Sequence, residues 1–104
     1  MEIRGQEVLI LSKMNTKEME NIADEIKEII KNKNKTYGNK NVIKMGKLGV
    51  LTRIEEKIER LRNMIENNIE DNESKEDTWK DIAGFGIIGT MLERNKWLAD
   101  NEKS

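Results

Sequence analysis

Apolar side chains recur at helical spacing in two long stretches of the chain. From Met19 to Ile30, isoleucine and alanine return every three or four residues among glutamates and lysines. The second stretch steps by three and four residues, which is the spacing of a two-heptad seam. Its members are Leu51, Ile54, Ile58, Leu61 and Ile65. We therefore predict helices over residues 15–33 and 47–68.

A third helix is predicted over residues 75–98. Ser74 and Asp77 have the spacing of a capping box, as do Asn15 and Glu18 at the start of the first helix. The segment from Ile82 to Leu92 contains no charged residue and is too short to span a bilayer. We therefore expect this helix to be buried on most of its sides.

The remaining segments are predicted to be an arm and a loop. Residues 1–14 carry a short apolar run that we expect to pack on the bundle or to cross to a second subunit, and polar residues 34–46 are predicted to form a loop. The 104 residues form one domain. Three amphipathic helices bury little surface alone, so we expect an all-α, small helical bundle of three main helices completed by oligomerisation.

Composition narrows the available chemistry. The chain has no proline, cysteine or histidine, which excludes disulfides, Cys/His zinc sites and a histidine base. Its net charge of −1 provides no basic field for nucleic-acid binding. No signal peptide is evident, and we expect a soluble, cytoplasmic protein without a membrane partner.

The segment Gly84–Gly89 spells the dinucleotide-binding pattern GxGxxG. That site needs a preceding strand and an acidic residue about twenty positions later in a βαβ unit. Too few residues follow Gly89 for a second strand. We interpret the glycines as positions that let neighbouring helices approach closely.

Two pairs of acidic residues are candidates for a metal site. Glu55 and Glu59 share one stripe of the second helix, and Asp77 and Asp81 share one stripe at the start of the third. A short turn between antiparallel helices would bring the two pairs together. Such oxygen ligands suit Mg²⁺ bound to substrate phosphates. The alternative is an ordinary solvated charged face.

Basic and aromatic residues precede the second helix. They are Lys35, Tyr37, Lys40, Lys44 and Lys47. Beside a carboxylate site, lysines would contact phosphates and the tyrosine ring would stack on a base. The alternative is a lysine-rich loop in solvent.

Three separated blocks of the sequence carry a family resemblance. They are residues 35–38, 49–63 and 76–83, which include Tyr37-Gly38, Glu55-Glu56-Lys57-Ile58-Glu59 and Thr78-Trp79-Lys80-Asp81. The chain resembles the phage nucleotide-modification-associated domain and, more distantly, the MazG-like all-α nucleoside triphosphate pyrophosphatases. The resemblance spans roughly residues 17–95.

The resemblance implies a site in which acids on two helices hold Mg²⁺ on nucleotide phosphates. MazG-like enzymes carry EExxE on one helix and ExxD on the next. The first motif is complete here; in the second, Asp81 matches but Thr78 replaces the acid, with Asp77 as an alternative. The roles implied are metal ligation by Glu55, Glu59 and Asp81; catalysis by Glu56 and Asp77; and nucleotide binding by Tyr37, Lys44, Lys47, Arg53 and Arg60.

Three functions follow as hypotheses. The first is a Mg²⁺-dependent nucleoside triphosphate pyrophosphohydrolase of a phage, acting as a homo-oligomer (dimer or tetramer) in the host cytoplasm. The second is a non-catalytic counter-defence protein that sequesters a nucleotide immune signal, which needs no complete acidic cluster. Thr78 favours this second hypothesis. The third is a helical scaffold without a ligand.

Overall fold

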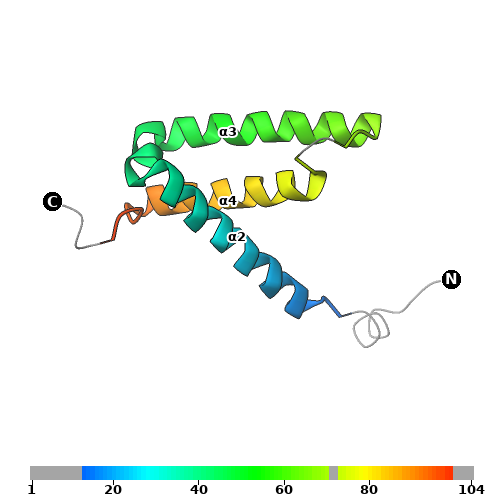
Figure 1. Cartoon of the computed structure of the whole chain (residues 1–104), viewed down its shortest axis with the longest axis horizontal. Coiled ribbons are helices and arrows are strands. Elements are labelled where there is room, and N and C mark those ends of the chain that lie inside the picture. Colours follow the sequence, from blue (N-terminus) through cyan, green and yellow to red (C-terminus); the bar gives the residue numbers. More distant parts are fainter. Residues whose placement is uncertain (1–12, 71–72, 100–104) are drawn as a thin grey trace.

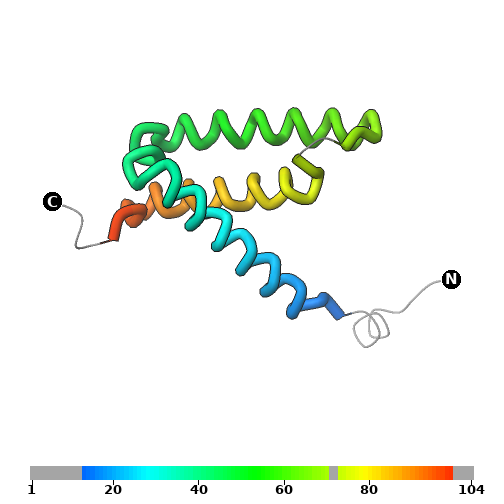
Figure 2. Tube along the Cα trace, viewed as in Figure 1, coloured from blue at the N-terminus to red at the C-terminus, as the bar shows by residue number. Residues whose placement is uncertain are grey.

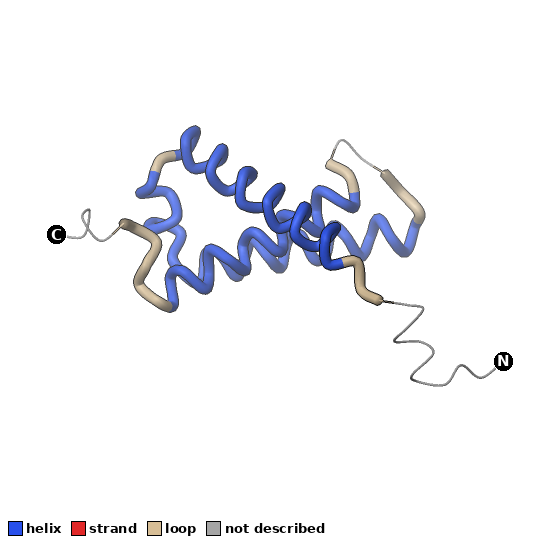
Figure 3. The backbone as a smooth tube through the Cα atoms, turned by 90° about the horizontal axis from the view of Figure 1, so that it is seen from below, coloured by secondary structure: helices blue, strands red, loops and turns tan. Residues whose placement is uncertain are grey.

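The computed structural model describes residues 13–70 and 73–99 and consists there of three helices. Helix α2 spans Thr16–Tyr37, α3 spans Asn39–Asn67 and α4 spans Lys75–Glu93. Helices α3 and α4 lie side by side and antiparallel, and α2 crosses them at one end (Figure 1). The described part contains no strand (Figure 3), which confirms the all-α fold. The predicted arm lies mostly outside the described residues.

Both predicted helix starts are confirmed by their capping hydrogen bonds. The Asn15 side chain accepts a hydrogen bond from the Glu18 amide at 3.0 Å. The Ser74 hydroxyl accepts one from the Asp77 amide at 3.0 Å. Each bond satisfies an amide that the helix itself leaves without a partner, so these short sequence patterns define where α2 and α4 begin.

The loop predicted over residues 34–46 is wrong, because most of this segment is helical. Helix α2 continues to Tyr37, and only Gly38 separates it from α3, where the chain turns back (Figure 2). Val42 is buried and Met45 half-buried, so this polar segment still presents apolar side chains to the core. Burial of those side chains outweighs the low helix propensity of the asparagines around them.

Two glycines permit the bends in this region. Gly38 has φ 83° and Gly46, inside α3, has φ 64°. A Cβ atom at either position would meet nothing within 4 Å. Backbone conformation, not crowding, is therefore what these positions require of glycine.

The core lies where the beginning of α3 meets the end of α4. Val42, Val50 and Ile88 form its buried cluster. Six partly buried side chains surround the cluster: Ile30, Met45, Ile54, Phe85, Leu92 and Trp97. Helix α4 ends at Glu93, before the predicted residue 98, and the following segment brings Trp97 back onto the core, where its indole N–H donates to the Asn39 carbonyl at 2.9 Å.

The predicted seam of the second helix is divided between two environments. Leu61 is buried and Ile54 is half-buried against α4. Leu51, Ile58 and Ile65, each one heptad apart, remain exposed. Within residues 13–70 and 73–99, the chain therefore covers only one side of this seam.

The glycines of α4 serve different purposes. A Cβ on Gly84 would lie 3.6 Å from the Ile30 side chain, which confirms the expected close approach of a neighbouring helix at this position. Gly86 and Gly89 face open space. None of the described helices is long and apolar enough to cross a membrane.

Candidate functional site

A cavity of about 640 Å³ lies between the end of α2, the α3–α4 pair and the segment that follows α4. This volume is within the usual range for small-molecule sites. Its charged lining residues are Lys33, Arg53, Glu56, Lys57, Arg60 and Glu73. Its aromatic lining residues are Tyr37, Phe85 and Trp97. Cationic and aromatic groups thus face the same space.

The Lys57 ammonium group is the centre of the charged wall. It lies 2.7 and 2.9 Å from the two carboxylate oxygens of Glu73 and 3.1 Å from Oδ2 of Asp81. The Lys57 side chain is only 24% exposed and that of Asp81 only 12%. This lysine therefore neutralises two carboxylates from which most of the solvent is removed.

Two further cations complete the network. Lys33, on α2, donates to Oδ1 of Asp81 at 3.2 Å. Arg60 donates to the Glu73 main-chain carbonyl at 3.0 Å, and its Nε lies 3.4 Å from the Glu73 carboxylate. The network joins α2, α3, α4 and the segment before α4, so it fixes the position of the cavity walls relative to one another.

The network shifts the pKa values of its central pair in opposite directions. Burial acts to lower the pKa of Lys57, but hydrogen bonds and charge interactions with Glu73 and Asp81 outweigh it and raise this pKa above its ordinary value. Burial acts to raise the pKa of Asp81, but hydrogen bonds from Lys57 and Lys33 and the charge of Lys33 lower it. Both residues are therefore held in their charged forms.

The rest of the wall is more open. Arg53 pairs with Glu56 one helical turn away at 3.0 Å, and both side chains are exposed. Tyr37 is also exposed, whereas Phe85 and Trp97 are half-buried. An exposed ion pair is worth little, so the Arg53 guanidinium is available to an incoming anion at small cost.

The structure does not bring together the five acids that the sequence analysis selected. Glu56 lines the cavity, and Asp81 belongs to the ion-pair network behind it. Glu55 and Glu59 are exposed and do not line the cavity, and Asp77 is exposed in the first turn of α4. Asp81 meets lysines, not the glutamates that we expected opposite it.

Thr78 stands where the resemblance predicts an acid, and its position is fully buried. Its hydroxyl donates to the Ser74 carbonyl at 2.9 Å within the first turn of α4. The side chain is therefore satisfied inside the helix.

The described residues do not fit a Mg²⁺ site within one chain. Across residues 13–70 and 73–99, no group of three or more acidic side chains is placed to hold a metal ion. In the ion-pair network, an ammonium group lies between Glu73 and Asp81. The involvement of Mg²⁺ stays a prediction.

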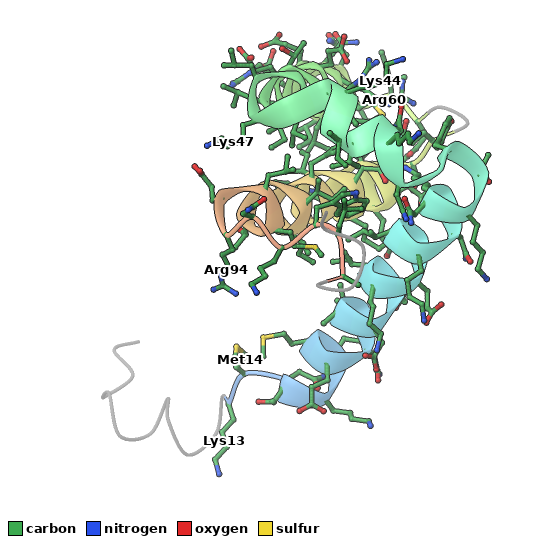
Figure 4. All side chains as sticks on the ribbon, turned by 90° about the vertical axis from the view of Figure 1, so that its left-hand side faces the viewer. Lys13, Met14, Lys44, Lys47, Arg60 and Arg94 are labelled. Carbon is green, nitrogen blue, oxygen red and sulfur yellow. The ribbon has the colours of Figure 1, made fainter. Side chains whose placement is uncertain are left out.

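Three of the five predicted nucleotide-binding residues line the cavity: Tyr37, Arg53 and Arg60. The other two do not. Lys44 is exposed, and Lys47 pairs with Glu93 of α4 at 2.7 Å. Figure 4 shows these two lysines pointing in different directions. They lie on either side of Gly46, whose non-helical backbone interrupts the register between them.

The residues that the sequence analysis missed are Lys33, Lys57, Glu73 and the two half-buried aromatic side chains. Lys57 had a detectable signal. It is seven residues from both Val50 and Met64, which are buried. A heptad separation keeps residues on one stripe, so this lysine interrupts a buried stripe and requires a carboxylate partner.

Glu73 had no such signal, because it belongs to a polar connection whose path the sequence pattern does not define.

The resemblance to the phage nucleotide-modification-associated domain and to MazG-like enzymes stays a prediction. No known protein family, no curated protein and no solved structure matches this chain.

Proposed function

We propose that this protein binds a nucleotide, with its phosphates on the cationic wall of the cavity and its base against the aromatic side chains. A single observation carries the proposal: four cationic side chains and three aromatic rings line one cavity of about 640 Å³. Phosphates bind arginine and lysine through charge-assisted hydrogen bonds, and bases stack on aromatic rings. Both kinds of group are available here in one place.

The cations have different tasks in this proposal. Lys57 is engaged with two carboxylates and shielded from solvent, so it maintains the wall. Arg53 and Lys33 are more than half exposed, and the exposed ion pair of Arg53 with Glu56 is one that a phosphate can replace. We therefore assign the first phosphate contacts to these two side chains.

Sequestration without turnover is the function that this geometry supports best. Binding through cations and rings requires no metal cluster. It also suits a phage counter-defence protein that withholds a nucleotide immune signal from its host. Mg²⁺-dependent pyrophosphohydrolysis is the second candidate, because Glu56 of the EExxE motif lines the same cavity. In either case we propose a homo-oligomer of phage origin acting in the host cytoplasm.

The first experiment separates these functions. Purified protein is incubated with the ribo- and deoxyribonucleoside triphosphates and with cyclic dinucleotides, in Mg²⁺ or in EDTA. Bound and released species are then identified by mass spectrometry before and after heat denaturation. An intact nucleotide released only by heat supports sequestration. Pyrophosphate beyond one equivalent in Mg²⁺ supports hydrolysis. If neither a heat-released nucleotide nor pyrophosphate is detected, the result contradicts nucleotide binding.

A matched pair of variants locates the binding site. Arg53→Gln and Arg62→Gln each remove an exposed arginine of α3 that pairs with a nearby glutamate. Only Arg53 lines the cavity. For the nucleotide identified above, Arg53→Gln is expected to raise Kd by about ten-fold or more, the value of one charged hydrogen bond. Arg62→Gln is expected to leave Kd unchanged, and equal effects would place the site elsewhere.

A further inference from the structure

The side of the α3–α4 pair opposite the cavity is apolar and uncovered by the described chain. Twelve large apolar side chains of the described residues are exposed, whereas six apolar side chains are buried. Five of the apolar residues on this side define a surface that we call the open face: Leu51, Ile58, Ile65, Trp79 and Ile82. Ile82 is half-buried, and the other four are exposed.

The open face has the geometry of a helix-packing surface. Its three α3 residues are spaced by one heptad and so form a stripe along that helix. Trp79 and Ile82 of α4 line a shallow groove with Ile58 and Ile65. At Gly86, further along α4, a Cβ atom would meet nothing within 4 Å. A flat two-helix layer of this kind is completed by a second two-helix layer.

We propose that the open face is covered by the open face of a second copy of this chain, with the two α3 helices antiparallel and centred on Ile58. In this register, Ile58 faces its own copy and Leu51 faces the partner's Ile65. The α4 helices then lie on the same side of the α3 pair and face each other. The result is a four-helix bundle with an isologous, two-fold interface.

The charges beside the stripe favour this arrangement. Glu55 and Arg62 each follow the stripe by four residues, which puts both on the same flank of it. The antiparallel register places Glu55 opposite the partner's Arg62, and symmetry forms this pair twice. A parallel two-fold pairing would place the two copies of this flank on opposite sides of the interface, so that this pair could not form. Electrostatic complementarity of this kind sets the orientation of paired helices.

The cavity does not take part in this contact. Seen along α3, the cavity-lining residues Arg53, Glu56 and Arg60 lie away from the stripe that carries Ile58. Dimerisation and nucleotide binding are therefore separate properties. An experiment that contradicts dimerisation does not contradict nucleotide binding, and the reverse also holds.

Charge reversal tests the register directly. Glu55 and Arg62 are about 10 Å apart along their own helix, so they do not contact each other within one chain. Glu55→Arg and Arg62→Glu are each expected to raise the dimer Kd by about ten-fold, because each places like charges opposite each other twice. The double variant restores the pair in reversed order and is expected to return Kd to within about three-fold of wild type.

Sedimentation equilibrium of the full chain over a wide concentration range provides the measurement. A wild-type chain that stays monomeric overturns the proposal, and so does a double variant whose loss equals the two single losses combined. A larger assembly that responds in the same way supports it, with the bundle as one of the interfaces.

A second pair of variants tests the centre of the interface. Ile58→Asp places two carboxylates on the two-fold axis and is expected to raise Kd by about a hundred-fold or more. Ile43→Asp, at a similarly exposed isoleucine outside the open face, is its control. Circular dichroism reports whether each variant keeps its helices. Equal self-association of the two folded variants would overturn the assignment of this face.

Discussion

The cavity side and the open face of the α3–α4 pair differ in how their side chains are satisfied. On the cavity side, Lys57, Glu73 and Asp81 are only partly exposed, yet each has a charged partner within 3.2 Å. On the open face, Trp79 is 58% exposed and no described segment covers it. The described part of one chain thus satisfies the polar groups of the first surface and leaves the apolar groups of the second uncovered.

The comparison also separates two reasons why a residue in an amphipathic helix departs from the expected pattern. Lys57 is a charge on the buried stripe, and its partners come from distant parts of the same chain. Ile58, its neighbour, is an apolar residue on an exposed stripe. We expect substitution of the first type to lower the stability of the monomer. The effect of substituting the second type is expected to depend on protein concentration.

Removal of the central cation is expected to give the largest effect on stability. Lys57→Met keeps the length of the side chain but leaves Glu73 and Asp81 without the ammonium group between them. The free energy of unfolding is expected to fall by about 2–3 kcal/mol, because two shielded carboxylates lose the cation that they share and keep only Lys33 and Arg60 as counter-charges. Urea denaturation at low protein concentration provides the measurement.

Two further variants sharpen this prediction. Lys44→Met removes an exposed lysine of the same helix and is expected to change stability by less than about 0.5 kcal/mol. Adding Asp81→Asn to Lys57→Met removes one of the two carboxylates that have lost their shared cation and is expected to recover part of the loss. If the lysine variants are equally stable, the ion-pair network does not hold the cavity walls.

The two tryptophans offer a second contrast, one for each surface. Trp97 is half-buried against the core and donates to the Asn39 carbonyl, so Trp97→Ala is expected to cost about 2 kcal/mol of monomer stability. Trp79→Ala, on the open face, is expected to cost less than about 1 kcal/mol in a dilute monomer. Denaturation at low concentration measures both values.

The same two variants are expected to exchange rank in a self-association experiment. Trp79→Ala removes the largest side chain of the open face, and aromatic anchors contribute strongly to interfaces. Trp97→Ala lies on the other side and is expected to retain the wild-type dimer Kd while it remains folded. Identical rank orders in the two experiments would mean that the surfaces are not independent.

The parts of the fold that depend on neighbouring residues were predictable from the sequence. Asn15 and Ser74 cap their helices within one turn, so a four-residue pattern was sufficient. The predicted loop failed because polar composition concealed Val42 and Met45, whose burial depends on α4 and on the segment after it. Helix formation there is a tertiary effect.

The site was less predictable than the fold. Arg53 and Arg60 were selected as candidate phosphate contacts, and they do line the cavity. Asp81 was expected to face the glutamates of the second helix, but the rotation of α3 presents Lys57 to it. That rotation is determined by apolar packing at Val50, Leu61 and Met64, and the spacing of the acidic residues carries no information about it.

Acidification is expected to give the smallest contrast between the two surfaces. Asp81 has a lower pKa in the folded chain than its ordinary value of 3.8, so it contributes stability above that value and loses the contribution as pH falls through its folded-state pKa. Unfolding free energy is therefore expected to decline below about pH 4, and less steeply in Asp81→Asn. Asp24→Asn, which removes an exposed carboxylate of α2, is expected to keep the wild-type slope.

At the alkaline end, the raised pKa of Lys57 preserves its contribution until pH exceeds 10.5. The apolar residues of the open face do not titrate, so Ile58→Ala is expected to shift stability equally at every pH, and a slope changed by this variant would contradict the separation of the two surfaces.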